Sequence, residues 1–295
     1  MFQIPGIVMP KSILVITDVH ETDHCSLKKA HQIAAPLGAE IDVVRFIKTN
    51  GIDSPDSVGV EQQSEALTAS LENIFADSEQ KRTITSQVIV TDDIVTWVVN
   101  YCHDKSFDLV IKAGHRSETL FHTPCDWELI RNLRVPVLIA SQQCWKHKPA
   151  VLAAVDPEAK DDIHHELNHA ILEWAGKWAR TFDCTIHLVY SLPVSNIMKE
   201  LDIIDLEEYA REHRAEGEDK LATLLNGHNL KNVNFHVTAG APERTIPHCA
   251  NELKAELVIM GSMGRSGIQG MLIGNVAEKV MHHLRTDSLI IERQK

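Results

Sequence analysis

The sequence predicts an α/β protein with two tandem domains, each an open five-stranded parallel sheet that carries helices on both faces. Two observations indicate this class. Short apolar runs alternate with helix-length segments along the chain, and the order of these segments in the first half is repeated in the second. Since neighbouring parallel strands must be joined by crossovers, this alternation is typical of parallel sheets covered by helices. A chain of 295 residues is long enough for two such domains.

Each half begins with an apolar strand that ends in an aspartate, Asp18 in the first half and Asp156 in the second. The segments that follow have helix length and then strand character in both halves. We expect first strands at 12–18 and 150–156, helices at 24–38 and 161–182, and second strands at 40–46 and 185–190. Residues 142–150 form the natural junction, so we expect one domain at 1–145 and another at 146–295.

The remaining elements of the two halves also correspond in order. Long polar stretches at 47–82 and 191–231 contain helical spacing at 60–76 and 206–226; the second of these is predicted as a solvated helix or a flexible lid. Third strands are expected at 86–91 and 233–238, helices at 92–104 and 242–254, fourth strands at 108–113 and 256–261, and last strands at 135–141 and 288–292. Each half is therefore predicted to have five strands that alternate with four helices.

A glycine-rich segment near the end of the chain predicts a phosphate-binding loop. It follows the apolar run 257–260 and contains Gly261, Gly264, Gly267, Gly270 and Gly274. Glycines allow positive φ values and a close approach of main-chain N–H groups to an anion. Asn275 is then expected as an N-cap with Glu278 three places on, and Val276, Val280 and Leu284 on one face of the helix. A helix N-terminus beside free amides favours a phosphate. Asn275 is equally explained as a helix cap without a ligand.

The spacing Gly261-x2-Gly264-x9-Gly274-Asn275 resembles the nucleotide-binding signature of the universal stress protein family. Two positions differ from that signature: Asn275 replaces a serine or threonine, and Met263 replaces a residue that is often histidine. The segment 122–131, His-Thr-Pro-Cys-Asp-Trp-Glu-Leu-Ile-Arg, is similar to a segment of the E-type tandem members, which are bacterial cytoplasmic proteins linked to stress resistance. The resemblance implies an adenine nucleotide alpha-hydrolase-like fold, with the two domains packed as an intramolecular pseudo-dimer and a further homodimer left open.

The resemblance also implies an ATP site, or a site for another adenine nucleotide, in the second half. Asp156 would bind ribose or adenine, and Val189 would present main-chain groups to the adenine edge. Gly261, Gly264 and Gly274 would shape the phosphate loop, with Arg265, Ser266, Asn275 and Val276 near the phosphates. Asp156 precedes Pro157, so it could instead simply start a turn.

Two functions are compatible with such a site. In the first, ATP, with or without Mg²⁺, binds to a stress-response signalling protein and alters the surface offered to a protein partner; turnover would be at most that of a slow ATPase. In the second, the chain is a nucleotide-independent structural or interaction protein. No GxSxG, GxGxxG or GxxxxGK[ST] motif is present, and no catalytic residue can be assigned from the sequence.

The first half lacks the glycine segment. Residues 114–120 contain one glycine and add Glu118, so triphosphate binding there is expected to be poor and this half is predicted to be a scaffold or a site for another ligand. Zinc is one candidate ligand, because His20, His115 and His122 follow strand ends on the same expected sheet edge, with Asp18, Cys125 and Asp126 nearby. The alternative is that these histidines are structural. His165 and His169, four apart on a helix, are predicted to lie on a solvated helix face.

Composition excludes several classes of partner. The formal net charge of −12 argues against nucleic acid, since phosphate contacts need a basic face. No apolar run approaches the 18 residues or so that span a membrane, and the first ten residues lack the basic leader of a signal peptide. Six cysteines are scattered without a CxxC pair, as expected for reduced thiols in the cytoplasm.

Overall fold

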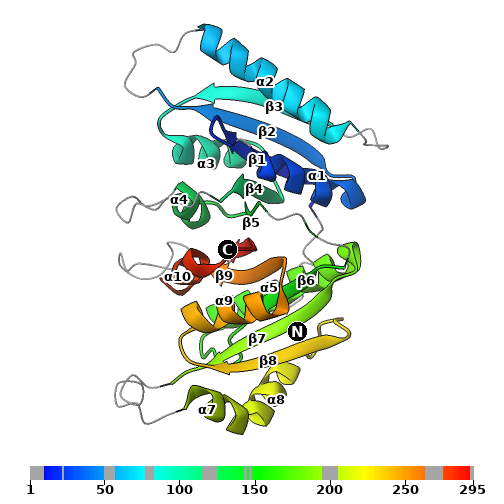
Figure 1. The fold of residues 1–295 in the computed structure, drawn as a ribbon, viewed down its shortest axis with the longest axis vertical. Coiled ribbons are helices and arrows are strands. Elements are labelled where there is room, and N and C mark those ends of the chain that lie inside the picture. The colour runs from blue at the N-terminus through cyan, green and yellow to red at the C-terminus, as the bar shows by residue number, and fades with distance from the viewer. Residues whose placement is uncertain are drawn as a thin grey trace. The chain divides into compact units, whose positions relative to one another are not determined.

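The structure is a computed structural model that describes residues 10–21, 23–49, 57–76, 83–114, 125–142, 145, 148–194, 205–262 and 275–292. The described residues up to 142 belong to one compact unit and those from Trp145 onward to another. Each unit is a parallel sheet with helices packed on it (Figure 1). The predicted fold class is confirmed in that both halves are α/β units with parallel sheets; the packing of the two domains as a pseudo-dimer stays a prediction.

The N-terminal unit has five strands in the order β3-β2-β1-β4-β5, and each described neighbour pair is parallel. Its elements are β1 (Ser12–Asp18), α1 (Cys25–Leu37), β2 (Glu40–Ile47), α2 (Ser57–Phe75), β3 (Ile84–Val90), α3 (Ile94–Asp104), β4 (Leu109–Ala113), α4 (Cys125–Asn132) and β5 (Val137–Ala140). The central strands β1 and β4 are almost fully buried, because helices cover both faces.

The C-terminal unit repeats this order as β8-β7-β6-β9-β10, again with parallel neighbours. Its elements are β6 (Ala150–Ala154), α5 (Asp162–Phe182), β7 (Thr185–Leu192), α7 (Leu206–Glu212), α8 (Arg214–Leu224), β8 (Val233–Ala239), α9 (Pro242–Leu253), β9 (Leu257–Ser262), α10 (Asn275–His283) and β10 (Asp287–Glu292). After β6 the chain forms β7 and then β8 on one side of β6. It then crosses over and forms β9 and β10 on the other side of β6.

The helices lie on both faces of each sheet, as neighbouring side chains on one strand show. Successive residues of a strand point to opposite faces. In β7, the Tyr190 hydroxyl reaches the side of the sheet that carries α8, whereas the Ser191 hydroxyl lies 2.6 Å from Thr245 Oγ1 of α9. In the N-terminal unit, Arg45 of β2 reaches Gln63 of α2, and the next residue, Phe46, packs edge-on against Trp97 of α3.

The segment predicted as one helix at 206–226 forms two helices, and the alternative of a flexible lid is wrong for α8. His213 ends α7 and precedes α8, and its ring Nδ1 lies 2.9 Å from the Tyr209 carbonyl oxygen. Helix α8 packs on the edge of the sheet: Leu221 is fully buried, and a Cβ at Gly217 would lie 2.7 Å from Val237 Cγ1. Because α7 and α8 are rich in charged residues, the sequence alone does not indicate this contact.

Trp145 belongs to the C-terminal unit although it precedes the first strand of that unit. Its indole N–H donates to Asp287 Oδ2 at 2.6 Å, and the Asp287 residue is fully buried. Its ring packs edge-on against Trp178 and Phe182 of α5, with centroid separations of 5.7 and 5.5 Å. The junction thus contains a side chain that fastens the start of this unit to α5 and β10.

We predict that Trp145→Phe lowers the stability of the C-terminal unit by about 1–3 kcal/mol, because the ring contacts remain but a buried carboxylate loses an N–H donor. Urea denaturation followed by circular dichroism measures the change. The control is Lys148→Ala, which removes an exposed ion pair with Asp183 (side chains 60% and 76% exposed) and should cost almost nothing. Equal midpoints for wild type and Trp145→Phe would contradict the prediction.

Candidate functional site

The candidate site of the C-terminal unit lies at the carboxyl ends of β6 and β9. These two strands are neighbours in the sheet, but the crossovers that leave them run to opposite sides. In open parallel sheets, ligands bind outside the carboxyl ends of the strands at such a switch point. Asp156 follows β6 by two residues, and Gly261 lies near the end of β9. The topology therefore places Asp156 and Gly261, the residue at which the glycine segment begins, at one edge of one sheet.

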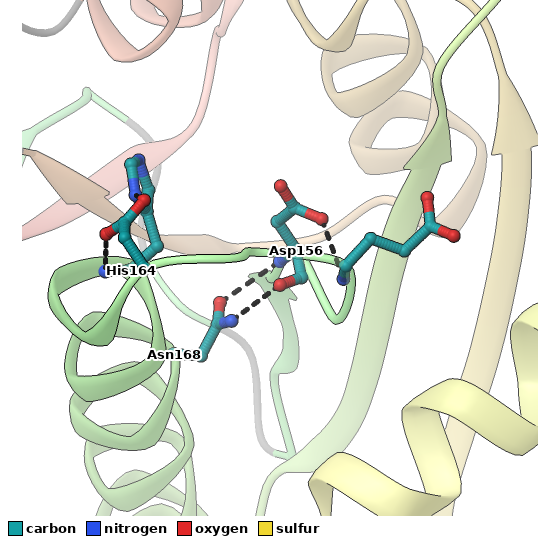
Figure 2. Close-up of polar contacts among 5 residues, drawn as sticks. Asp156, His164 and Asn168 are labelled. Atoms are coloured by element: carbon teal, nitrogen blue, oxygen red, sulfur yellow. Dashed lines mark hydrogen bonds and ion pairs between the residues drawn. The ribbon is translucent and has the colours of Figure 1, made fainter.

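The main chain of Asp156 is held by a buried amide on α5 (Figure 2). The Asp156 N–H donates to Asn168 Oδ1 at 3.0 Å, and Asn168 Nδ2 donates to the Asp156 carbonyl oxygen at 2.6 Å. Asn168 is only 4% exposed, so this amide reaches Asp156 from the interior of the unit. Sequence reasoning missed Asn168. The available signal was an asparagine within the apolar, core-facing spacing of α5, where a polar residue needs partners.

The carboxylate of Asp156 closes a turn and remains accessible. Its Oδ1 accepts the Glu158 N–H at 3.0 Å, and the Ala159 N–H donates to the Asp156 carbonyl oxygen at 3.2 Å. The alternative in which Asp156 starts a turn thus describes a contact that is present. That contact uses one carboxylate oxygen, and Asp156 is exposed, so the second oxygen can accept a hydrogen bond from a ligand. The turn and the ligand role are compatible.

Helix α5 begins just after this turn with a side-chain cap. Asp161 accepts the His164 N–H at 2.9 Å, and its other oxygen lies 2.6 Å from His164 Nδ1 (Figure 2). The pKa of Asp161 is lowered mainly by the hydrogen bond from the His164 N–H and secondly by the hydrogen bond with the His164 side chain. The cap fixes where α5 starts and hence where Asn168 meets Asp156.

Val189 lies inside β7 and is only 1% exposed. Its main chain pairs with β8 on one side, and its carbonyl oxygen accepts the Val155 N–H at 3.2 Å on the other. The contact of Val189 with an adenine edge stays a prediction, and the sheet already uses part of the main-chain capacity that the prediction assigned to it.

Gly261 is glycine for a packing reason that the sequence did not reveal. It is a residue of β9 paired with Ile291 of β10, and it is not among the described glycines with positive φ, so that part of its predicted role is wrong. A Cβ at Gly261 would lie 2.3 Å from Leu167 Cδ2 and 2.4 Å from Leu167 Cγ. Only glycine lets α5 approach the end of β9 this closely.

The rest of the predicted phosphate loop falls partly outside the described residues. Gly264, Arg265, Ser266 and Gly274 lie outside them, and so does the side chain of Asn275. The described part of α10 runs from Asn275 to His283, and the N-cap role expected for Asn275 stays a prediction. Val280 is fully buried as predicted, whereas Val276 is 49% exposed and does not share the buried face.

The zinc prediction for the N-terminal unit concerns His20, His115 and His122. His20 is exposed after β1, and the other two lie outside the described residues. Within the part of the chain that the structure describes, no group of three or more His, Cys, Asp or Glu is arranged to hold a metal ion. Asp126, a further candidate ligand, pairs with Lys112 Nζ at 2.6 Å, with both side chains 8% exposed.

We predict that replacing Gly261 with alanine destabilises the C-terminal unit by about 1–3 kcal/mol through overpacking against Leu167. In a Leu167→Ala background, the same change should cost much less, because the clashing atoms are gone. Urea midpoints of the four proteins of this cycle measure the coupling. The control is Gly59→Ala in α2, where a Cβ meets nothing within 4 Å and alanine should stabilise the helix. Additive costs in the cycle would rule out Leu167 as the cause.

Two pairs of histidines join elements of the C-terminal unit. His187 Nδ1 of β7 lies 2.9 Å from His236 Nε2 of β8, and His169 Nδ1 of α5 lies 2.7 Å from His228 Nε2 before β8. Each contact needs one N–H and one lone pair, so it is lost when both rings are protonated. The pKa values of His187, His228 and His236 are lowered. Burial is the largest cause, and a neighbouring cation or imidazole is the second.

We predict that the C-terminal unit loses stability as the pH falls through and below the ordinary histidine pKa of 6.5. The folded unit holds these imidazoles at lowered pKa values, so the unfolded chain binds more protons and the free energy of unfolding decreases. Urea midpoints between pH 7.5 and pH 5 measure the trend. His236→Gln should flatten it, and the exposed His165→Gln should leave it unchanged. An unchanged slope in His236→Gln would refute the assignment.

The fold and the site define a tandem α/β protein whose parallel sheets carry a candidate ligand site at a strand switch point. The sequence model described as the universal stress protein family matches this chain twice, at residues 9–141 and 150–292. The chain therefore belongs to the universal stress protein family, as a member with two such domains. The resemblance seen in the sequence is confirmed.

Relatives and solved structures agree with this membership. Universal stress protein E of Escherichia coli K12 is 28% identical over 302 residues, which covers 96% of this chain and 94% of that protein. The Universal stress protein E homolog of Haemophilus influenzae is 31% identical over 198 residues, or 65% of this chain and 64% of that protein. A crystal structure of a functionally unknown protein from Pseudomonas aeruginosa PAO1 has a TM-score of 0.70 at 22% identity and covers 96% of this chain and 92% of that one.

A universal stress protein from Archaeoglobus fulgidus has a TM-score of 0.64 at 17% identity and covers 96% of this chain and 99% of its own. At these identities, the structural likeness supports the fold alone. Among the described residues, the helices are too short or too polar to cross a membrane.

Proposed function

We propose that this protein is an ATP-binding, cytoplasmic stress-response and signalling protein whose nucleotide site lies in the C-terminal domain, at 146–295. One observation carries the proposal. The accessible carboxylate of Asp156 lies at the switch point between β6 and β9, and the glycine segment with the family signature begins at Gly261, near the end of β9 at the same sheet edge. A polar anchor and a phosphate-binding segment at one edge suit a ligand with a ribose or adenine end and an anionic end.

In this proposal, Asp156 uses its second carboxylate oxygen to accept a hydrogen bond from ribose or adenine. Val189 offers its remaining main-chain capacity to the base. Gly261 ends the strand without a side chain, and Gly264 and Gly274 allow the close approach to the phosphates. Arg265, Ser266, Asn275 and the Val276 amide lie near the phosphates, where the N-terminal end of α10 favours negative charge. An accompanying Mg²⁺ would neutralise phosphate charge.

Binding, and not turnover, is the activity that the residues support. Near Asp156, the described neighbours are the amide of Asn168, the N–H groups of the turn and the carboxylate of Glu158, which is held by other side chains. None of these is arranged as a nucleophile with an activating base. We therefore propose a nucleotide-dependent change in the surface that a protein partner recognises, with at most slow hydrolysis. In this proposal the N-terminal domain serves as a scaffold without nucleotide.

We predict that Gly264→Asp abolishes ATP binding, since its side chain would fill the loop and its charge would oppose the phosphates. Asp156→Ala should weaken binding about 10-fold to 100-fold, the loss of a hydrogen bond to a charged group. Isothermal titration with ATP and Mg²⁺ measures both. The matched control is Asp18→Ala, the equivalent change in the first half, which should leave the affinity unchanged.

Mass spectrometry of the purified protein for a co-purified nucleotide is the companion experiment. If wild type and Gly264→Asp bind ATP equally, or if neither binds it, the proposed function fails. The chain would then act as the nucleotide-independent structural or interaction protein, in which the Asp156 contacts only stabilise a turn and α10 is only a packed helix.

A further inference from the structure

The turn that carries Asp156 is held from a second side by residues of β7 and α8. The Glu158 carboxylate accepts the Tyr190 hydroxyl at 2.5 Å on Oε2 and the Lys220 ammonium at 2.6 Å on Oε1. Lys220 also pairs with Glu216, one turn earlier on α8, at 2.6 Å. Glu158 therefore bridges the turn after β6 to a neighbouring strand and to a helix more than fifty residues further along the chain.

The two groups that hold Glu158 differ in burial and so in mobility. Tyr190 is only 2% exposed and its hydroxyl is delivered from the sheet, which makes it a fixed donor. Burial, together with Glu158, raises the pKa of Tyr190, so the phenol keeps its proton. The Lys220 side chain is 30% exposed on α8, and α8 itself is anchored by the buried Leu221. The hydrogen bond from Lys220 is the largest cause that lowers the pKa of Glu158, and the hydrogen bond from Tyr190 is the second, so the carboxylate is ionised at neutral pH.

Glu158 is linked to Asp156 by hydrogen bonds from the main chain of the turn. The Glu158 N–H is the donor that holds Asp156 Oδ1, at 3.0 Å. The next N–H, of Ala159, donates to the Asp156 carbonyl oxygen at 3.2 Å. A displaced Glu158 would move both donors and allow the Asp156 carboxylate to rotate. Asn168 fixes the start of the same turn, so the turn is clamped at both ends.

We propose that Lys220 and Tyr190 are positioning residues for the nucleotide site: by holding Glu158, they keep the Asp156 carboxylate in the orientation that receives the ligand. The inference rests on the proposed function. Neither residue contacts Asp156 in the described contacts, and neither is assigned to bind the ligand. They act through the geometry of the turn, and preorganisation of a binding group raises affinity by removing the cost of ordering it.

A purely structural ion pair would behave differently. The side chains of Lys220 and Glu158 are 30% and 41% exposed, and pairs of that exposure contribute little to global stability. We therefore expect the loss of Lys220 to leave the unfolding midpoint of the protein nearly unchanged while it weakens ATP binding. If the pair served stability alone, the loss of Lys220 would lower the unfolding midpoint and leave ATP binding unchanged.

The experiment compares ATP affinity, by isothermal titration with Mg²⁺, in wild type, Lys220→Met, Lys220→Arg and Lys160→Met. Lys160→Met removes an equal positive charge near Glu158 without removing a contact to it, since Lys160 is exposed and acts on Glu158 only at a distance. We expect Kd to rise about threefold to tenfold in Lys220→Met, roughly the value of one hydrogen bond, with recovery in Lys220→Arg. Lys160→Met should stay near wild type.

Amide hydrogen exchange gives a second readout that needs no nucleotide. The N–H groups of Glu158 and Ala159 should exchange faster in Lys220→Met than in wild type, and Tyr190→Phe should produce the same change. If Lys220→Met and Lys160→Met weaken ATP binding equally, or if Lys220→Met binds as wild type does, the positioning role is refuted while the proposed function stands. Failure of wild type to bind ATP would remove the proposed function and this inference together.

Discussion

The arrangement of parallel strands is the constraint on which the rest of the C-terminal unit depends. Because β6 pairs with β7 on one side and with β9 on the other, the crossovers that leave β6 and β9 must diverge. Their carboxyl ends are then neighbours whose following loops turn away from each other. Asp156 and Gly261 lie at one edge of the sheet for this reason, although more than one hundred residues separate them in the chain.

Helix α5 fixes the geometry of the residues at this edge of the sheet. Its first turn is capped by Asp161, its Leu167 packs where Gly261 has no side chain, and the next residue, Asn168, holds both main-chain polar groups of Asp156. Because Leu167 and Asn168 are adjacent, the close approach at Gly261 also sets the distance between Asn168 and the turn. One glycine of the family signature therefore has a packing role, because it leaves room for Leu167 of α5.

The sequence predicted what depends on local pattern and left out what depends on contacts between distant residues. The apolar runs and the repeat identified the two sheets, because burial on both faces leaves a clear signature. Asn168, Tyr190 and Lys220 escaped notice because their partners are remote: Lys220 lies on a charged helix whose sequence reads as solvated, and only the fold shows that Leu221 anchors it. The N-cap role of Asn275 stays a prediction, because the residue before it and its own side chain lie outside the described residues.

The two domains share a fold but differ in the chemistry at the start of the helix that follows the fourth strand. Helix α4 has Asp126 and Glu128 in its first turn, and Asp126 forms a buried ion pair with Lys112 of β4. A carboxylate of the protein thus supplies the negative charge that a helix N-terminus favours, and an incoming phosphate would meet like charge. Helix α10 has Glu278 as its first-turn acid, and β9 has Met260 where β4 has Lys112. The first half also lacks the glycine segment, and these differences, not a difference in the sheets, are why a nucleotide site is proposed for one domain and a scaffold for the other.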